Sequence, residues 1–157
     1  MSRLLLLAFF LATIAAIVSA ECPGGYTQRE NGGNCYKVWH DFHWYRYAMS
    51  ACEDEGGWLV TIRNAEDQAW VNNFYKQRQG HCHDDYWIGA NDLQDEGHFR
   101  WLQDNSDVTW AVWRWGEPND SSGEDCVNNN LYWNAWNDAG YEWQTYCFVC
   151  EMFPKSC

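Results

Sequence analysis

The chain has 157 residues and a formal net charge of −12, from 22 acidic and 10 basic residues. This acidity argues against nucleic acid and anionic membrane surfaces as partners. The length suits one domain with its own hydrophobic core. The eight cysteines form an even set, which in a secreted protein indicates disulfide bonds.

The first twenty residues have the pattern of a secretory signal. Arg3 precedes an apolar run over residues 4–18, and the small residues Ser19 and Ala20 follow it. We predict a signal peptide over residues 1–20 and a secreted, extracellular domain over residues 21–157. A membrane anchor is the alternative, but the run is short for one, and no later segment is long and apolar enough to enter a bilayer.

A hairpin and a helix are predicted next along the chain. Residues 22–35 place a Gly/Asn turn between two cysteines, which predicts a hairpin closed by Cys22–Cys35. Residues 44–55 then carry apolar side chains at helical spacing, and the Gly-Gly pair at 56–57 ends this helix. A short strand is expected over residues 58–62.

A second helix is expected to begin at Asn64, which forms a capping pair with Asp67. Its apolar face consists of Trp70, Val71, Phe74 and Tyr75, and Gly80 ends it. Residues 86–90 read as a buried core strand. The rest of the chain consists of strands and loops, and residues 146–153 form the closing strand.

Residues 117–138 concentrate carboxylates and side-chain amides. Such a cluster repels itself unless a cation lies inside it, and oxygen ligands of these types suit the hard cation Ca²⁺. Glu117 and Asn119 flank Pro118, and a cis bond before this proline would turn both side chains toward one point. We therefore predict a calcium-binding loop.

This stretch resembles the long loop and following strand of a C-type lectin-like domain. The resemblance is carried by Glu-Pro-Asn at 117–119 and Trp-Asn-Asp at 136–138, with Trp-Ile-Gly at 87–89 matching a core strand. It implies an α+β fold with two helices, small antiparallel sheets and a long calcium-binding loop stapled by disulfides. It also implies one principal calcium ion, completed by two sugar hydroxyls and held by Glu117, Asn119, Glu124, Asn137 and Asp138.

A second, auxiliary calcium site is implied by acids after the core strand. Asp92 and Glu96 match positions at which some family members keep two ligands. The long loop would complete the site with Asp120, Glu124 and Asp125. The alternative is an acidic turn exposed to solvent, and hard-cation chemistry favours the metal.

The resemblance also implies disulfide pairs. It pairs Cys52 with Cys150 and, although the family's usual position after Trp-Asn-Asp lacks a cysteine here, Cys126 with Cys147. Cys82 and Cys157 then remain, to pair with each other or to join a second subunit; eight cysteines allow 105 connectivities. His81 and His83 flank Cys82, but ligands this tightly spaced rarely close a zinc shell.

The aromatic residues divide into two groups by position. A core role is expected for Trp44, Trp58, Trp70, Trp87, Trp101, Trp110 and Trp113. A second group lies beside the calcium loop in sequence, where a ring could stack on a sugar: Trp115, Tyr132, Trp133, Trp136, Tyr141 and Trp143.

Three classes of function compete. A glycosidase would use Glu117 and Asp138 as its carboxylate pair, but amides and calcium would keep both acids ionised, so we expect no enzyme. A mineral- or ice-surface or matrix protein needs acids but not amides at ligand positions. The amides of Asn119 and Asn137 favour a lectin.

The Glu-Pro-Asn order implies sugars of the mannose, glucose, N-acetylglucosamine and fucose type, in recognition of microbial or cell-surface glycans. Galactose is the alternative if a tryptophan reorients the ring. Asn119-Asp120-Ser121 is also a glycosylation sequon, which we expect to be unmodified. One shallow site binds weakly, so a homo-oligomer is expected.

Overall fold

The computed structural model describes residues 20–156, so the predicted signal peptide (apart from Ala20) and Cys157 lie outside the described residues. Two helices, α1 (Tyr45–Asp54) and α2 (Ala65–Arg78), lie among ten strands. The strands are β1 (Ala20–Glu21), β2 (Thr27–Gln28), β3 (Cys35–His43), β4 (Trp58–Leu59), β5 (Asp85–Asn91), β6 (Arg100–Trp101), β7 (Cys126–Asn130), β8 (Ala135–Ala139), β9 (Tyr146–Met152) and β10 (Lys155–Ser156).

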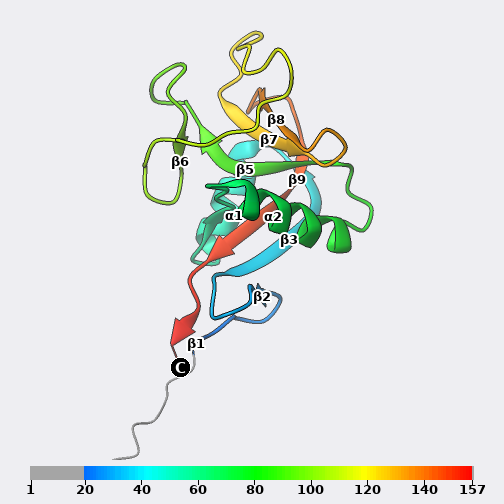
Figure 1. Ribbon diagram of the computed structural model, residues 1–157, viewed down its shortest axis with the longest axis vertical. Coiled ribbons are helices and arrows are strands. Elements are labelled where there is room, and N and C mark those ends of the chain that lie inside the picture. Colours follow the sequence, from blue (N-terminus) through cyan, green and yellow to red (C-terminus); the bar gives the residue numbers. More distant parts are fainter. Residues whose placement is uncertain (1–19, 157) are drawn as a thin grey trace, which may run out of the picture.

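One mixed sheet organises the fold (Figure 1), with strand order β2-β3-β9-β5-β7-β8, β4 added to β9 and β6 added to β5. All its pairs are antiparallel except β5 with β9. A separate pair, β1 with β10, joins the two ends of the described chain. The α+β class expected from the sequence is confirmed.

The two helices begin and end close to the expected positions. The backbone N–H of Asp67 donates to the Asn64 side chain at 2.9 Å, which is the predicted cap of α2. Helix α2 buries Val71, Phe74 and Tyr75, as its apolar spacing predicts. The expectation for Trp44 is wrong: it precedes the first turn of α1 and is 57% exposed, because α1 turns Tyr45, Ala48 and Cys52 inward instead.

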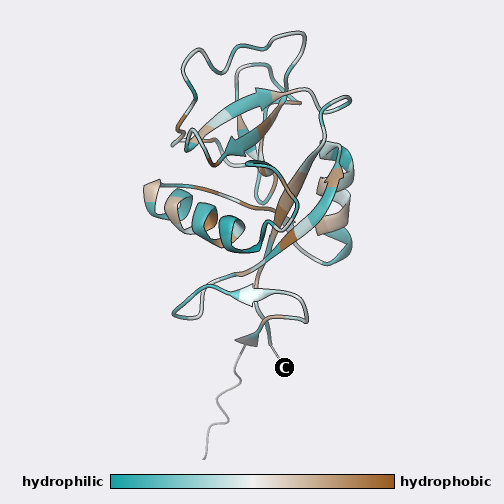
Figure 2. Cartoon of the chain, turned by 90° about the vertical axis from the view of Figure 1, so that its right-hand side faces the viewer, coloured by the Kyte–Doolittle hydropathy of each residue, from teal (hydrophilic) through white to brown (hydrophobic). Residues whose placement is uncertain are grey.

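Two hydrophobic clusters fill the interior, and the strands that run through it are the most apolar elements (Figure 2). Trp136 is fully buried and meets the rings of Trp101, Trp110 and Trp113 edge-on at 5.8–5.9 Å. Trp136 is therefore a core residue and not one beside the loop surface. Gly89 lets β5 approach the 59–60 backbone, since a Cβ there would lie 2.4 Å from the Leu59 carbonyl oxygen.

Two predicted disulfides are present, Cys22–Cys35 and Cys52–Cys150. The predicted Cys126–Cys147 pair is wrong, and so is pairing of Cys82 with Cys157, because Cys82 bonds to Cys147. The pairing depends on which hydrophobic cluster each cysteine side chain enters. Cys82 and Cys147 both lie in the cluster under α2, whereas Cys126 lies in the cluster under α1.

The thiol of Cys126 has no disulfide partner among residues 20–156 and is fully buried. Burial raises the pKa of this thiol well above its ordinary range. A raised pKa leaves little of the reactive thiolate form. Over the same residues, neither helix has the length and apolar character needed to cross a membrane.

Candidate functional site

The long loop before β7 carries the first group of predicted ligands and lies at one end of the molecule, beside β7 and β8 (Figure 1). The Glu117–Pro118 peptide bond is cis, as expected. The backbone N–H of Glu117 donates to the Arg114 carbonyl at 3.0 Å. Asp120 and Ser122 adopt positive φ of 46° and 73°, so the loop turns back on itself within a few residues.

Asp138 organises this loop from β8. Its side chain is fully buried, and its Oδ2 accepts hydrogen bonds from the backbone N–H groups of Asn119 (2.8 Å) and Asp120 (2.7 Å). The Asn119 amide donates to Glu117. The backbone N–H of Glu124 donates to Asp120 at 2.9 Å. The structure therefore brings Glu117, Asn119 and Glu124 around Asp138.

Asn137, the fifth predicted ligand, precedes Asp138 on β8. Its side-chain nitrogen contacts the Asp138 carbonyl oxygen and lies 3.3 Å from the side-chain oxygen of Asn128 on β7. Asn128 and Asn137 are direct partners in the β7–β8 ladder. This residue is therefore half-buried at the edge of the cluster.

The carboxylates in this group repel one another. Burial raises the pKa of Glu117, and the neighbouring Asp138 carboxylate raises it further. Burial and Asp138 also raise the pKa of Glu124. Carboxylates that raise one another's pKa are stabilised by a cation placed among them.

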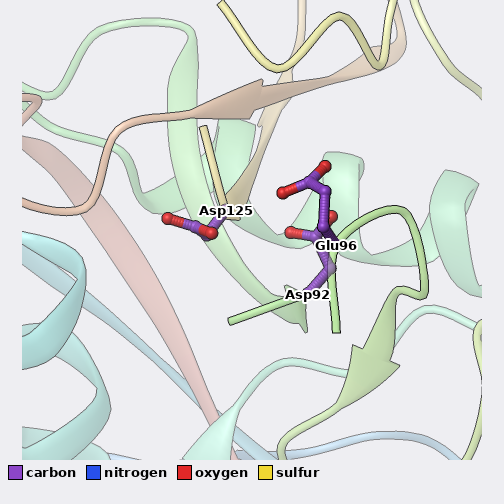
Figure 3. Close-up of side chains that lie close together, drawn as sticks. All are labelled: Asp92, Glu96 and Asp125. Atoms are coloured by element: carbon purple, nitrogen blue, oxygen red, sulfur yellow. The ribbon is translucent and has the colours of Figure 1, made fainter. Parts of the chain in front are cut away.

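A second acidic group lies one loop away. Asp92 and Glu96, from the loop after β5, meet Asp125, which directly precedes β7 (Figure 3). One ligand atom from each of these three lies within 4.8 Å of the others. Burial raises the pKa of Asp92 to about 6, with Glu96 and Asp125 contributing. Asp120, which we expected here, accepts from the Glu124 backbone instead.

Each group contains a buried carboxylate oxygen that no donor among residues 20–156 reaches: Oδ1 of Asp138 and Oδ1 of Asp92. A buried charged oxygen without a partner costs several kcal/mol, so an external group is needed at both places. The predicted ligands in the two groups are all Asp, Glu or Asn, which offer carboxylate and amide oxygens, and none is His or Cys. The residues therefore fit Ca²⁺, whose preferred ligands are carboxylate and amide oxygens.

Four aromatic side chains on the same part of the chain are exposed: Trp115 (97%), Tyr132 (76%), Trp133 (54%) and Trp143 (54%). The Arg114 guanidinium lies over the Trp133 ring, 4.9 Å from its centroid. Tyr141 is half-buried against Arg46. Trp115 is two residues before Glu117 and is the most exposed of these rings.

A polar row was missed by the sequence reasoning. Asn128, Asn130 and Asp85 lie on one face of the sheet, where both amides donate to Asp85 at 2.7 and 3.0 Å. The available signal was the run Asn128-Asn129-Asn130 inside a strand, since Asn and Asp are disfavoured in strands.

The family described as Lectin C-type domain matches residues 43–152. The chain therefore belongs to the C-type lectin domain family. It is 35% identical over 137 residues to a perlucin-like protein of Mytilus galloprovincialis, covering 83% of this chain and 77% of that protein. It is 32% identical over 144 residues to CD209 antigen-like protein 2 of Macaca mulatta, covering 87% of this chain and only 50% of that protein.

Solved structures agree with this fold. The carbohydrate-recognition domain of cow CD23, determined in the presence of a GlcNAc2Man3 oligosaccharide, matches with a TM-score of 0.73 and 30% identity over 88% of this chain and 99% of that one. A calcium-independent type II antifreeze protein matches with a TM-score of 0.71 over 85% of this chain and 95% of that one. Its identity is 22%, so that likeness concerns the fold alone.

Proposed function

We propose that the protein is a calcium-dependent, carbohydrate-binding lectin. Glu117, Asn119, Glu124, Asn137 and Asp138 would hold the principal ion, and Asp92, Glu96 and Asp125 an auxiliary one, with Asp120 linking the two groups. The observation that carries the proposal is the buried Asp138 carboxylate. Its Oδ1 lies among acids and amides and has no hydrogen-bond partner in the described part of the chain.

Bound calcium would supply open coordination positions for two neighbouring sugar hydroxyls. The residues of this chain would then orient the hydroxyls. Glu117 can only accept a hydrogen bond, whereas the amide of Asn119 can also donate one. The order of acid and amide around Pro118 therefore gives the hydroxyl pair a direction.

The sugar class that this order favours is mannose, glucose, N-acetylglucosamine or fucose. The relatives named above support it, since the CD23 domain was studied with a mannose-containing oligosaccharide. The exposed ring of Trp115 is the feature that would favour galactose instead, by stacking on its apolar face. We keep the mannose-type class because Glu117 and Asn119 contact each other as a pair in the loop.

The alternative role at an ice or mineral surface has weaker support, because the antifreeze likeness concerns the fold alone. Relatives in sequence include a perlucin-like protein and CD209 antigen-like protein 2. We place the protein outside the cell, acting on glycans, with a homo-oligomer supplying avidity.

A glycan array with calcium and with EGTA tests the proposal. Binding to mannose-type glycans that EGTA abolishes is the expected result. Asp138→Asn should lose binding, whereas Asp107→Asn, at an exposed acid outside the cluster, should retain it. Calcium-insensitive binding, or a glycan found on Asn119 by mass spectrometry, would contradict the proposal.

A further inference from the structure

Three exposed histidines lie on two segments outside the calcium loop. His40 belongs to β3, and His81 and His83 belong to the loop between α2 and β5. The ring centroids of His40 and His81 are 6.5 Å apart. The fold therefore places two imidazoles from distant parts of the sequence beside each other at the surface.

The loop that carries His81 is held against β3. Cys82, the next residue, forms a disulfide with Cys147 on β9. Its sulfur lies 3.5 Å from the carbonyl oxygen of His40. The backbone N–H of Cys82 also donates to the Gln79 carbonyl at 2.8 Å. The backbone at His81 is therefore fixed beside His40, and the sulfur of Cys82 is used in the disulfide and not as a metal ligand.

The ring of His40 is oriented by a backbone carbonyl. Its Nε2 lies 2.5 Å from the carbonyl oxygen of Arg78, and because a carbonyl only accepts, Nε2 carries the proton and donates it. In the neutral ring, Nδ1 then keeps its lone pair. The ring also packs on Gly80, where a Cβ would lie 3.4 Å from its Cδ2. A histidine that donates one N–H to a carbonyl has the tautomer and orientation typical of a metal ligand.

The spacing of the two rings is close to that of a shared metal ion. Because a zinc–nitrogen bond is about 2.0–2.1 Å, two imidazoles that bind one ion have ring centroids about 5–6 Å apart. The observed separation is 6.5 Å. Within the part of the chain that the structure describes, the ring of His81 makes no hydrogen bond, and the terminal torsion of a histidine is broad. A small rotation of His81 therefore brings both rings to one ion.

His83 has a different neighbour. Its ring meets the Phe42 ring edge-on, with centroids 5.1 Å apart, whereas the centroids of His81 and Phe42 are 6.1 Å apart. The sequence alone indicated only His81 and His83, whose tight spacing around Cys82 does not favour a metal. The structure replaces His83 with His40, a residue from another strand, as the partner of His81.

We propose that His40 and His81 form a site for a divalent transition-metal ion, Zn²⁺ or Cu²⁺, separate from the two acidic groups. Imidazole nitrogen suits these ions, whereas Ca²⁺ takes oxygen ligands. The two kinds of metal therefore bind at different places on the same chain. Two protein ligands leave the other coordination positions to water, so the ion exchanges with solvent, and Cu²⁺ binds more tightly than Zn²⁺.

Calorimetric titration with Zn²⁺ and with Cu²⁺ tests the site, using protein without a histidine tag. Millimolar calcium is present throughout, so that the carboxylate groups are already occupied. We expect saturable binding of one ion per chain. His40→Ala and His81→Ala should each weaken it by at least the 10–100-fold, approximately, that loss of a ligand's supporting partner costs. Electron paramagnetic resonance of the Cu²⁺ form should show two nitrogen ligands, and one in either variant.

His83→Ala is the matched control, because His83 is an exposed histidine of the same loop whose ring packs on Phe42. It should keep the affinity for both ions. Melting temperatures in calcium alone show that each variant is folded; if one is not, the Cu²⁺ spectrum of the unaltered protein decides. Absence of saturable binding, a spectrum with oxygen ligands only, or an equal loss in His83→Ala would overturn the proposal.

Discussion

The Asp138 carboxylate on β8 holds the backbone of Asn119, nineteen residues earlier in the chain, through a hydrogen bond of 2.8 Å. One oxygen thus fixes the long loop, while the other, Oδ1, is buried and accepts no hydrogen bond from the residues that the structure describes. The same side chain joins the structure of the loop to the proposed metal site. Calcium binding and loop order should therefore change together.

Replacing Asp138 tests this coupling. Asp138→Asn should abolish the rise in melting temperature that calcium gives the unaltered protein. Ligand binding to the folded state alone stabilises by RT ln(1 + [L]/Kd), about 2.7 kcal/mol at 100 times Kd. Differential scanning fluorimetry in millimolar calcium and in EGTA measures the shift. Asp107→Asn is the control and should keep the full shift; the absence of any shift in the unaltered protein would refute calcium binding.

The donor and acceptor order of the loop gives a second prediction. Glu117→Gln combined with Asn119→Asp exchanges the acid and the amide on either side of Pro118. Because the oxygen ligands remain, calcium binding should persist, while preference should move from mannose toward galactose. Competition by free mannose and galactose on immobilised sugars measures the change. A preference for galactose in the unaltered protein would show that the mannose-type assignment is wrong.

Trp115 gives a third prediction because its side chain is 97% exposed. A surface residue without packing contributes little to stability, within about 0.5 kcal/mol. Trp115→Ala should therefore leave the melting temperature nearly unchanged. If the ring contacts the bound sugar, affinity should fall about threefold to tenfold, as expected for a stacked aromatic contact of about 0.5–1.5 kcal/mol. Trp44→Ala is a matched control, because Trp44 is 57% exposed and lies outside the calcium loop. Equal affinities for both variants and the unaltered protein would exclude this contact.

Much of the fold follows from local patterns in the sequence. The Asn64 cap and the spacing of Val71, Phe74 and Tyr75 predict α2 closely, because these signals depend on neighbours within one helix. The predicted ligand residues come from the motifs around Pro118 and Trp136. Their meeting at Asp138 depends on contacts about twenty residues apart, which no local pattern specifies.

The disulfide error has the same origin. The positions of Cys126 and Cys147 along the chain would permit a disulfide. Their side chains, however, lie on opposite sides of the sheet. The side of the sheet on which a side chain lies depends on the register of β7 and β9 and not on spacing along the chain. The polar row of Asp85, Asn128 and Asn130 was missed for a similar reason, since strand pairing brings these residues together across more than forty positions of the chain.

The corrected pairing predicts the reactivity of Cys126. Burial and the raised pKa should make this thiol unreactive in the folded protein and reactive once the chain is unfolded. Iodoacetamide labelling of a Cys157→Ser variant, followed by peptide mass spectrometry, measures this. We expect label on Cys126 only in denaturant, and peptides linking Cys82 to Cys147 in both states. A peptide linking Cys126 to Cys147 would contradict the structure.

The last prediction concerns the effect of pH on Asp85. Burial raises the pKa of this carboxyl above its ordinary value, although Asn130 and Asn128 partly oppose the shift. The folded state therefore keeps the proton to higher pH than the unfolded state. Stability then decreases as pH rises from the ordinary pKa through the raised pKa, and the loss is complete above the raised pKa.

Asp85→Asn removes this titration while keeping an oxygen that accepts from both asparagines. At pH 7 the variant should melt about 1–2 °C above the unaltered protein, a size typical of a partly exposed position. The difference should disappear below the ordinary pKa, where Asp85 is protonated in both states. Thermal unfolding at pH 7 and pH 3, in EGTA so that calcium does not contribute, measures it, with Asp107→Asn, an exposed acid outside this polar row, as the control. A variant less stable at pH 7 would show that the ionised carboxylate stabilises the fold.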